Sequence, residues 1–286
     1  MKGSIVAIVT PMDHKGSIDF DSFSRLIKFH EDSGTDGIVL VGTTGESATL
    51  NKEEREEVFK FAAELTHIPL MAGIGSSSTL ESCELAEVAL KHGIIECLAV
   101  TPYYNKPSQK GLSLHYKELC KTEANITLYN VPGRTGVDLL PKTVFDLIEI
   151  ENITGIKEAV NTADRFEDLL KVKAARPEFS LLSGDDPTFV SFMKEGADGI
   201  ISVAANVMPK QIKKLSDLCF SKEFEEAEAI NEKYLNLYEL LFTEASPSPC
   251  KFLLEKMSLL ENNLRLPLHP LSEEFKEEIY EAFNKI

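Results

Sequence analysis

The chain of 286 residues is short of positive charge: 30 Lys and Arg stand against 46 Asp and Glu, for a formal net charge of −16. Binding to nucleic acid needs a basic surface, so this composition argues against a nucleic-acid partner. An anionic substrate needs local donors, because the overall field opposes it. No apolar run approaches the roughly 18 residues of a membrane-spanning helix. The N-terminus enters a strand pattern at once, without the features of a signal peptide. We therefore predict a cytoplasmic protein without a membrane partner.

The cysteines are few and scattered: there are five, and no CxxC pair occurs among them. This argues against both a zinc site and a disulfide framework, and we expect buried, reduced thiols. The six histidines form no ligand-spaced cluster, and we interpret His92 and His115 as structural rather than metal-binding. We therefore expect no metal. The first predicted turn also lacks a GxGxxG fingerprint, which disfavours a Rossmann domain.

What the chain does contain is a series of eight short apolar runs, each followed by a helical pattern. The runs recur at roughly 27 residues, as expected for consecutive βα units. Eight such units predict an α/β protein with a (β/α)8 TIM barrel rather than an open doubly wound sheet. The predicted strands are residues 5–9, 37–41, 69–74, 97–100, 126–129, 153–157, 180–182 and 199–203. The predicted helices are residues 23–30, 53–65, 80–90, 114–119, 144–148, 166–172, 188–193 and 212–218.

Beyond residue 222 the strand pattern stops. Helical patterns follow at residues 223–242, 249–260 and 272–286, separated by proline-containing segments. We therefore predict a barrel catalytic domain of residues 1–222 and a C-terminal helical domain of residues 223–286. Such a helical appendage could pack on the barrel or against another subunit. The first of these helices has an apolar stripe that we interpret as packing surface, made of Leu235, Tyr238, Leu241 and Phe242.

Lys157 is the most unusual residue of the predicted barrel, because lysine is disfavoured in strands and is mostly exposed in folded proteins. Side chains alternate along a strand, so Gly155 and Lys157 share the lumen face if Ile156 packs against the helices. A lysine that is desolvated there has a lowered pKa, and its neutral amine can form a Schiff base with a carbonyl. The alternative interpretation is a strand-end lysine that reaches water, paired with Glu158.

Tyr129 is predicted to point into the lumen beside Lys157. Neighbouring strands lie about 4.8 Å apart, so a phenol and an amine at equivalent heights can share a proton. This favours Tyr129 as the acid/base partner in carbinolamine chemistry, although it could also be an aromatic of a barrel layer. Arg134 follows five residues later in a Gly/Pro loop. It fits a carboxylate clamp at the rim, or simply a surface cation.

Polar and glycine-rich loops follow other strands, at the ends where barrels carry their active sites. The segment Gly42–Ser47 places Thr43 and Thr44 between two glycines. It fits an anion site, or a turn in which Ser47 or Asn51 caps the next helix. Tyr103 and Tyr104 cannot both bury on one side of their loop, so one can face the site while the other packs elsewhere.

Two further strand ends carry weaker signals. Asp185 and Asp186 are interpreted as helix-start residues rather than catalysts. Ile201 could present an apolar wall or a backbone carbonyl to a small substrate, and ordinary barrel packing explains it equally well.

Six motifs occur in order along the chain: GTTGES, TPYYN, YNVPGRTG, GIKEA, LLSGDD and GIISVAAN. Together they resemble the pyruvate-dependent lyases and aldolases, over essentially the whole chain. Within these enzymes they are most similar to the dihydrodipicolinate synthase (4-hydroxy-tetrahydrodipicolinate synthase) family. Arg134 marks that branch, because the N-acetylneuraminate lyase branch typically lacks an arginine there.

The resemblance implies roles for individual residues. Lys157 matches the lysine that forms a Schiff base with pyruvate, and Tyr129 matches the tyrosine that moves protons to and from the adduct. Thr43 and Tyr104 match a proton relay in which the second tyrosine crosses from a neighbouring subunit. The residues that match substrate contacts are Thr44, Arg134, Gly184 and the backbone of Ile201, with Arg134 on the carboxylate of the aldehyde substrate.

The implied reaction joins pyruvate to L-aspartate 4-semialdehyde in lysine and diaminopimelate biosynthesis, without a metal or an organic cofactor. A homotetramer built as a dimer of dimers is implied as well. The nearest alternative is another 2-oxo acid lyase, such as N-acetylneuraminate lyase or a 2-keto-3-deoxy sugar acid aldolase. A different class of alternative is a catalytically silent metabolite-binding barrel.

Many members of the family are inhibited by L-lysine at the tight dimer interface. Sensitive members often have histidines where this chain has Lys52 and Arg55, and asparagine where it has Ser77. Two added cations disfavour a bound ammonium unless they contact its carboxylate, so we expect weakened or absent feedback. Glu81 and Tyr103 keep the expected types, and Glu81 suits the inhibitor's ammonium. The matching positions are Ser47, Ala48, Lys52, Arg55, Ser77, Glu81 and Tyr103.

Overall fold

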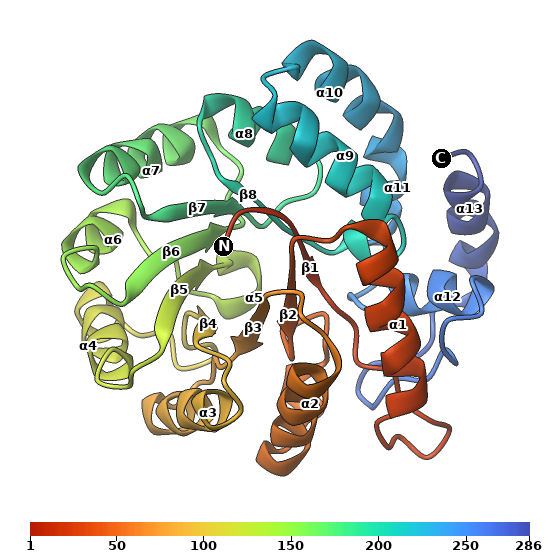
Figure 1. Ribbon diagram of the computed structural model, residues 1–286, viewed down its shortest axis with the longest axis horizontal. Coiled ribbons are helices and arrows are strands. Elements are labelled where there is room, and N and C mark those ends of the chain that lie inside the picture. Colours follow the sequence, from red (N-terminus) through yellow and green to blue (C-terminus); the bar gives the residue numbers. More distant parts are fainter.

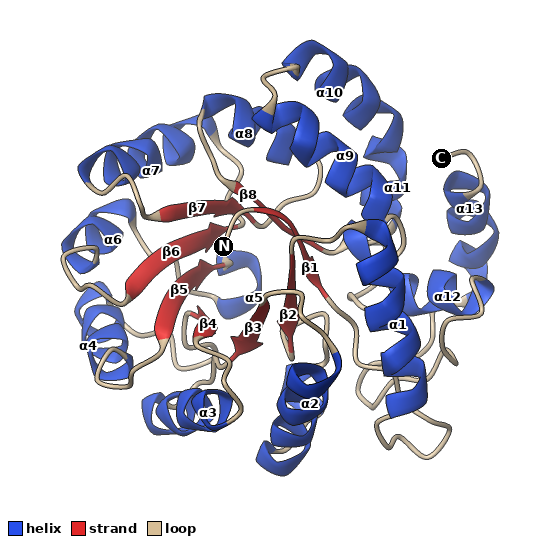
Figure 2. Ribbon diagram, viewed as in Figure 1, coloured by secondary structure: helices blue, strands red, loops and turns tan.

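The computed structural model describes residues 1–286 and shows a closed barrel of eight parallel strands inside a layer of helices (Figures 1 and 2). Each strand pairs with the next along the chain, and β8 pairs with β1. The predicted barrel and its eight strands are therefore confirmed, with ends that move by one or two residues. The strands are β1 Gly3–Ala7, β2 Gly37–Leu40, β3 Leu70–Gly73, β4 Glu96–Val100, β5 Asn125–Asn130, β6 Ile153–Glu158, β7 Ser180–Ser183 and β8 Gly199–Ser202.

The first four helices of the outer layer begin at side chains that cap their free N–H groups. Asp19 accepts a hydrogen bond from the Ser22 N–H at the start of α1, and Asn51 forms a capping box with Glu54 at the start of α2. Most of these helices are longer than predicted, and the four-residue helix α5 was not predicted. The helices are α1 Phe20–Ser33, α2 Lys52–Leu65, α3 Thr79–Lys91, α4 Gln109–Leu119, α5 Pro132–Thr135, α6 Pro141–Leu147, α7 Ala163–Ala175, α8 Phe189–Glu195 and α9 Pro209–Phe220.

Four more α-helices follow α9 without a strand between them, and they run along one side of the barrel beside α1 and α9 (Figure 1). The predicted helix of residues 223–242 is two helices, α10 and α11, joined by a 3₁₀ turn. One apolar cluster of 65 buried residues includes side chains of the barrel layer and of this tail. The domain boundary at residue 222 stays a prediction. The elements are α10 Phe224–Asn231, η3 Glu232–Tyr234, α11 Leu235–Leu240, α12 Ser248–Lys256 and α13 Glu273–Phe283, and two earlier 3₁₀ turns are η1 Ser47–Thr49 and η2 Ala204–Asn206.

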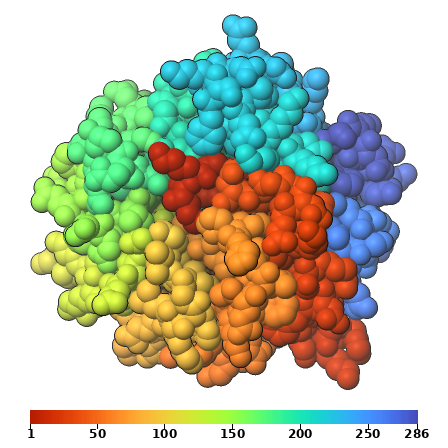
Figure 3. Space-filling model, in the orientation of Figure 1, coloured from red at the N-terminus to blue at the C-terminus, as the bar shows by residue number.

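The strands separate two apolar layers, as expected from alternation. Ile126, Leu128 and Ile156 belong to the large cluster between strands and helices. Tyr129 and Ile201 belong to a cluster of 8 buried residues inside the barrel. The N-terminal residues, red in Figure 3, cover the middle of the barrel face seen there, and Met1 packs against the inner cluster.

None of the helices combines the length and the apolarity needed to cross a membrane. The five cysteines are free thiols. Three of them are buried (Cys97, Cys219 and Cys250) and two are half-buried (Cys83 and Cys120).

Candidate active site

Strands β5 and β6 place Tyr129 directly opposite Lys157. The register depends on an irregularity: Ile126 pairs with Ile153, but the next residue, Thr127, pairs with Gly155. Without this one-residue shift Tyr129 would lie opposite Ile156, whose side chain faces the helices. The Lys157 Nζ atom lies 4.4 Å from the centroid of the Tyr129 ring. The amine is therefore over the face of the ring, and it makes no hydrogen bond to the phenol.

Lys157 is 5% exposed and makes no ion pair or hydrogen bond within the chain. Burial lowers the pKa of its amine to about 8; the charge of Asp186 opposes this shift and that of Arg134 adds to it. Gly184 leaves the space for the lysine, because a Cβ atom there would lie 3.0 Å from Lys157 Cε. The amine is thus largely buried, faces the cavity and has a lowered pKa, as a Schiff-base lysine requires.

Tyr129 is 8% exposed, and burial raises the pKa of its phenol to about 12. The charge of Arg134 and the nearby Thr43 hydroxyl lower this pKa, whereas the charge of Glu158 raises it. The phenol therefore keeps its proton at neutral pH. It can donate that proton to a group formed beside Lys157 and recover it later.

A cavity of about 340 Å³ lies over these residues at the carboxyl ends of the strands. Its volume suits a small molecule. Ile201 is buried inside the barrel beneath it, and Tyr104 lies outside it, with 94% of its surface exposed and a left-handed φ of 73°. The predicted site residues that line the cavity are Thr43, Thr44, Tyr129, Arg134, Lys157 and Gly184.

The loop after β2 has a strained start and a buried anchor. Val41 has a φ of 54°, an unusual conformation for a β-branched residue. Beyond it Thr43 and Thr44 line the cavity, while Glu46 is fully buried in an ion pair with Lys251 of α12. Asn51 caps α2, which is one of the two alternatives considered for this loop. The structure thus ties the two threonines to the C-terminal tail.

A smaller cavity of about 30 Å³ lies behind Thr43 and Tyr129 and extends toward Ser47. It is large enough for about one water molecule. The two cavities share the Thr43 and Tyr129 side chains.

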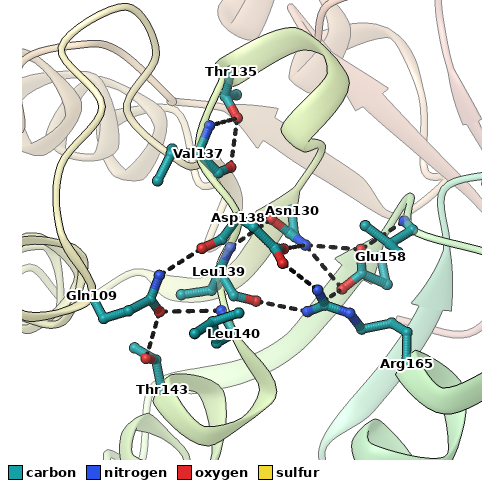
Figure 4. A network of polar contacts seen from close by, with 11 residues as sticks. Gln109, Asn130, Thr135, Val137, Asp138, Leu139, Leu140, Thr143, Glu158 and Arg165 are labelled. Carbon is teal, nitrogen blue, oxygen red and sulfur yellow. Dashed lines mark hydrogen bonds and ion pairs between the residues drawn. The ribbon is translucent and has the colours of Figure 1, made fainter.

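Arg134 is exposed at the rim, in the short helix α5, and the chain after it is held by a buried polar network (Figure 4). Asn130 donates to Asp138 and Glu158, and its own oxygen accepts the Leu139 N–H. Arg165 forms ion pairs with Asp138 and Glu158. Burial raises the pKa of Glu158 to about 7, against its hydrogen bond from the Val160 N–H and the charge of Arg165. This network anchors the loop that carries Arg134 to β5, β6 and α7.

Asp186 has a different position from the one predicted. Asp185 does bond to the Thr188 N–H before α8, as a helix-start residue would, but Asp186 is buried and bonds to the chain after β8. Ser202 Oγ, Val203 N–H and Ala204 N–H donate to it. Burial raises its pKa, and its charge acts on Lys157. The sequence did not predict this difference, because Asp185 and Asp186 are adjacent residues of the same type.

The tail also contributes to the cavity wall, which the sequence did not predict. Three residues of the tail line the cavity: Tyr238 and Glu239 in α11, and Phe242 just after that helix. Tyr238 and Phe242 were interpreted as packing surface, and Tyr238 is indeed fully buried. Only a tertiary contact, invisible to helical periodicity, brings this stretch over the barrel mouth.

The residues considered for L-lysine binding lie together around the start of α2 and α3. Arg55 is 5% exposed and donates to the backbone oxygens of Leu50 and Ser47. Burial lowers its pKa, and the charges of Glu81 and Tyr103 oppose this. Lys52 forms an ion pair with Glu84, at 2.7 Å. Ser77 and Ala48 are exposed and Ser47 is half-buried. Whether these positions bind lysine stays a prediction.

No group of three or more His, Cys, Asp or Glu side chains in the structure is arranged as metal ligands would be. The side chains that line the cavity include an amine, a phenol, hydroxyls and a guanidinium, together with the carboxylates of Asp185 and Glu239. The amine, the phenol and the guanidinium suit carbonyl chemistry on a substrate that carries a carboxylate.

Comparisons with known proteins agree over the whole chain. A model described as the dihydrodipicolinate synthetase family matches residues 1–286. The 4-hydroxy-tetrahydrodipicolinate synthase of Stutzerimonas stutzeri (strain A1501) is 46% identical over 286 residues, which cover 99% of this chain and 97% of that protein. The structure of the chloride-inhibited dihydrodipicolinate synthase of Acinetobacter baumannii, complexed with pyruvate, has a TM-score of 0.96 and 44% identity and covers 99% and 98% of the two chains. A lysine-bound DHDPS from Cyanidioschyzon merolae has a TM-score of 0.95 and 32% identity, with 99% and 97% covered.

Proposed function

This chain belongs to the dihydrodipicolinate synthetase family, and we propose that it condenses pyruvate with L-aspartate 4-semialdehyde to give 4-hydroxy-tetrahydrodipicolinate, in lysine and diaminopimelate biosynthesis. It is a lyase that works through a Schiff base on lysine. The observation that carries this proposal is the buried Lys157 opposite Tyr129, in a cavity whose rim holds Arg134.

The reaction begins with the neutral Lys157 amine. It attacks the C2 carbonyl of pyruvate to give a carbinolamine, and loss of water with a proton from the Tyr129 phenol gives the Schiff base. The Tyr129 phenolate recovers its proton from C3 to give the enamine. The enamine C3 then attacks the aldehyde carbon of the semialdehyde, and the aldehyde oxygen takes up a proton from the phenol to become the hydroxyl group. The amino group of the second substrate then attacks C2, the ring closes, and Lys157 leaves as the free amine. One water is released over the whole sequence.

The other predicted site residues have supporting roles. We assign Thr43 to a proton relay with Tyr129, supported by the position of both side chains on the same two cavities, and Tyr104 to the end of that relay in a neighbouring subunit. The exposure and left-handed φ of Tyr104 suit a residue that completes its contacts in an assembly. Thr44, Gly184 and the Ile201 backbone are assigned to pyruvate, and Arg134 to the carboxylate of the semialdehyde.

We propose that no metal or organic cofactor takes part, because the iminium of the Schiff base itself withdraws electrons from C3. We also propose a cytoplasmic enzyme that assembles as a homotetramer, a dimer of dimers. The biosynthetic role of the named relatives supports the location, and the exposed Tyr104 supports the assembly.

The relatives favour the synthase over N-acetylneuraminate lyase or a sugar acid aldolase. They are named 4-hydroxy-tetrahydrodipicolinate synthase, and this chain matches them over nearly their whole length. Turnover with pyruvate and aspartate semialdehyde, compared with N-acetylneuraminate and 2-keto-3-deoxy sugar acids, separates these activities. A catalytically silent barrel would show turnover with none of them.

We propose weak or absent feedback by L-lysine. Lys52 and Arg55 each have partners within the chain, so both positive charges are fixed near the place where an ammonium would bind. Strong inhibition of the purified enzyme at low lysine concentration would contradict this proposal.

The experiment that tests the function is trapping with borohydride. Incubation with pyruvate and borohydride should inactivate the enzyme and add the mass of a reduced pyruvate adduct to the peptide that contains Lys157. Borohydride alone should do neither. An unmodified Lys157 peptide would remove the Schiff base from the mechanism.

A further inference from the structure

Two carboxylates line the cavity, and their surroundings differ. Asp185 accepts hydrogen bonds from Asn161 Nδ2 and from the N–H and hydroxyl of Thr188, so it holds the chain before α8. Glu239 lines the same cavity and makes no side-chain hydrogen bond or ion pair within the chain. Glu239 is thus a negative charge at the mouth of the site with nothing in the protein to bind.

The backbone that presents Glu239 is well fixed. On either side of it Leu237, Tyr238 and Leu240 are buried, and the Tyr238 hydroxyl donates to Asn231 at 3.2 Å. Asn231 in turn donates to the Pro187 oxygen, in the loop after β7. The helix is therefore anchored to the barrel beside the cavity, while the Glu239 side chain is exposed.

The chemistry of the second substrate leaves a place for such a charge. L-Aspartate 4-semialdehyde has three polar groups: the aldehyde, which must reach the adduct on Lys157, a carboxylate, which suits Arg134, and an ammonium. Of the charged side chains that line the cavity, Arg134 and Lys157 repel an ammonium and Asp185 is already bonded. Glu239 is the remaining partner of opposite charge.

We propose that Glu239 is a specificity-determining residue that binds the ammonium of the second substrate, and this inference rests on the proposed function. The ammonium and the carboxylate share one carbon, so Arg134 and Glu239 must approach it from the two sides of the mouth. Both have long, exposed side chains, from α5 and from α11, that can do so. Together they select an amino acid aldehyde over an aldehyde with a carboxylate alone.

The test compares two aldehydes and two variants. Glu239→Gln keeps the size of the side chain and removes its charge, and Glu232→Gln removes an exposed charge of the same tail that does not line the cavity. The KM for aspartate semialdehyde should rise about fivefold in Glu239→Gln, as expected for a charge-assisted hydrogen bond at an exposed site. The KM for pyruvate, and all constants of Glu232→Gln, should stay within about twofold. The effect should shrink at high salt.

Succinate semialdehyde, which has the same chain and carboxylate but no ammonium, separates recognition from a structural role. As a competing aldehyde it should inhibit Glu239→Gln at least as strongly as the unmodified enzyme, because its only charged group is a carboxylate. An equal loss of affinity for both aldehydes, or no change in the KM for aspartate semialdehyde, would overturn the inference while the proposed function stands. Absence of turnover by the unmodified enzyme would overturn the function and the inference with it.

Discussion

The chain buries two lysines, Lys157 at the centre of the barrel and Lys251 at the junction of barrel and tail. Lys157 is 5% exposed and has no hydrogen bond or ion pair. Lys251 is 0% exposed, pairs with the buried Glu46 and donates to the Asn263 oxygen at 2.7 Å. Burial lowers the pKa of both amines, but Glu46 opposes this at Lys251 by direct contact, whereas Asp186 opposes it at Lys157 only through space. The difference in partners separates a reactive amine from a structural cation.

The loop after β2 links the two lysines. Its Thr43 and Thr44 line the cavity with Lys157, and its Glu46 binds Lys251 and accepts the Arg265 N–H. An unpaired buried amine destabilises the fold and provides chemistry, while a paired one fixes two distant segments. Each substitution below should break one side of this comparison and leave the other intact.

The largest effect is expected for Lys157→Met. Removal of the nucleophile should lower kcat/KM by more than about 10⁴-fold, as for other nucleophiles of covalent catalysis. Stability should stay the same or rise, because an unpaired buried amine is lost. Steady-state kinetics and urea denaturation measure the two quantities. A variant that unfolds more easily than the unmodified enzyme would show that Lys157 has a structural partner after all.

A smaller loss is expected for Tyr129→Phe. The ring that lies over the amine is kept and only the hydroxyl is removed, so turnover should fall by roughly 10²–10⁴-fold, as is usual for a general acid–base group. Borohydride trapping should still label Lys157, more slowly, because the amine itself is unchanged. Near-normal turnover would remove the phenol from the mechanism.

The opposite pattern is expected for Lys251→Met. Glu46 would remain buried without its partner, which should lower the free energy of unfolding by about 3–5 kcal/mol. The folded fraction should still form the Schiff base, with a raised KM for pyruvate because the loop of Thr43 and Thr44 is less well held.

The double variant Glu46→Gln/Lys251→Met is the control for this prediction. It removes both charges and should regain most of the lost stability in urea denaturation. If the double variant is as unstable as the sum of the two single variants, the pair makes no specific contribution.

The pattern of apolar residues along the sequence was sufficient to predict the barrel and the face of β6 that carries Lys157. Apolar runs at regular spacing gave the eight strands, and alternation placed Tyr129 and Lys157 in the lumen. Alternation did not explain why Tyr129 lies directly opposite Lys157. This pairing depends on the register shift between Ile126 and Thr127, which no sequence pattern indicates.

Long-range contacts account for what could not be predicted. Glu46 and Lys251 are 205 residues apart, and each was unremarkable in its own segment. Glu239 follows a buried tyrosine on a helix that reads as packing surface, and only the position of the tail over the barrel brings it to the cavity. Asp186 differs from Asp185 through its contacts with the chain after β8.

The smallest expected effect is a pH dependence that distinguishes the amine of Lys157 from that of Lys251. Only the neutral amine attacks pyruvate, so kcat/KM for pyruvate should rise about tenfold per pH unit below the Lys157 pKa of about 8 and level off above it. The free energy of unfolding should depend on the ionisation of the same amine.

Between pH 8 and the ordinary lysine pKa of 10.5 the unfolded chain binds a proton that the folded chain does not, so stability rises with pH. The stability advantage of Lys157→Met should therefore be largest below pH 8, on the order of 3 kcal/mol, and vanish above about pH 10.5. Glu232→Gln alters an exposed charge outside the cavity, so it should leave unchanged the pH at the midpoint of the kcat/KM profile for pyruvate. A midpoint near 10.5 would mean that Lys157 is as well hydrated as a surface lysine, and the contrast with Lys251 would then fail.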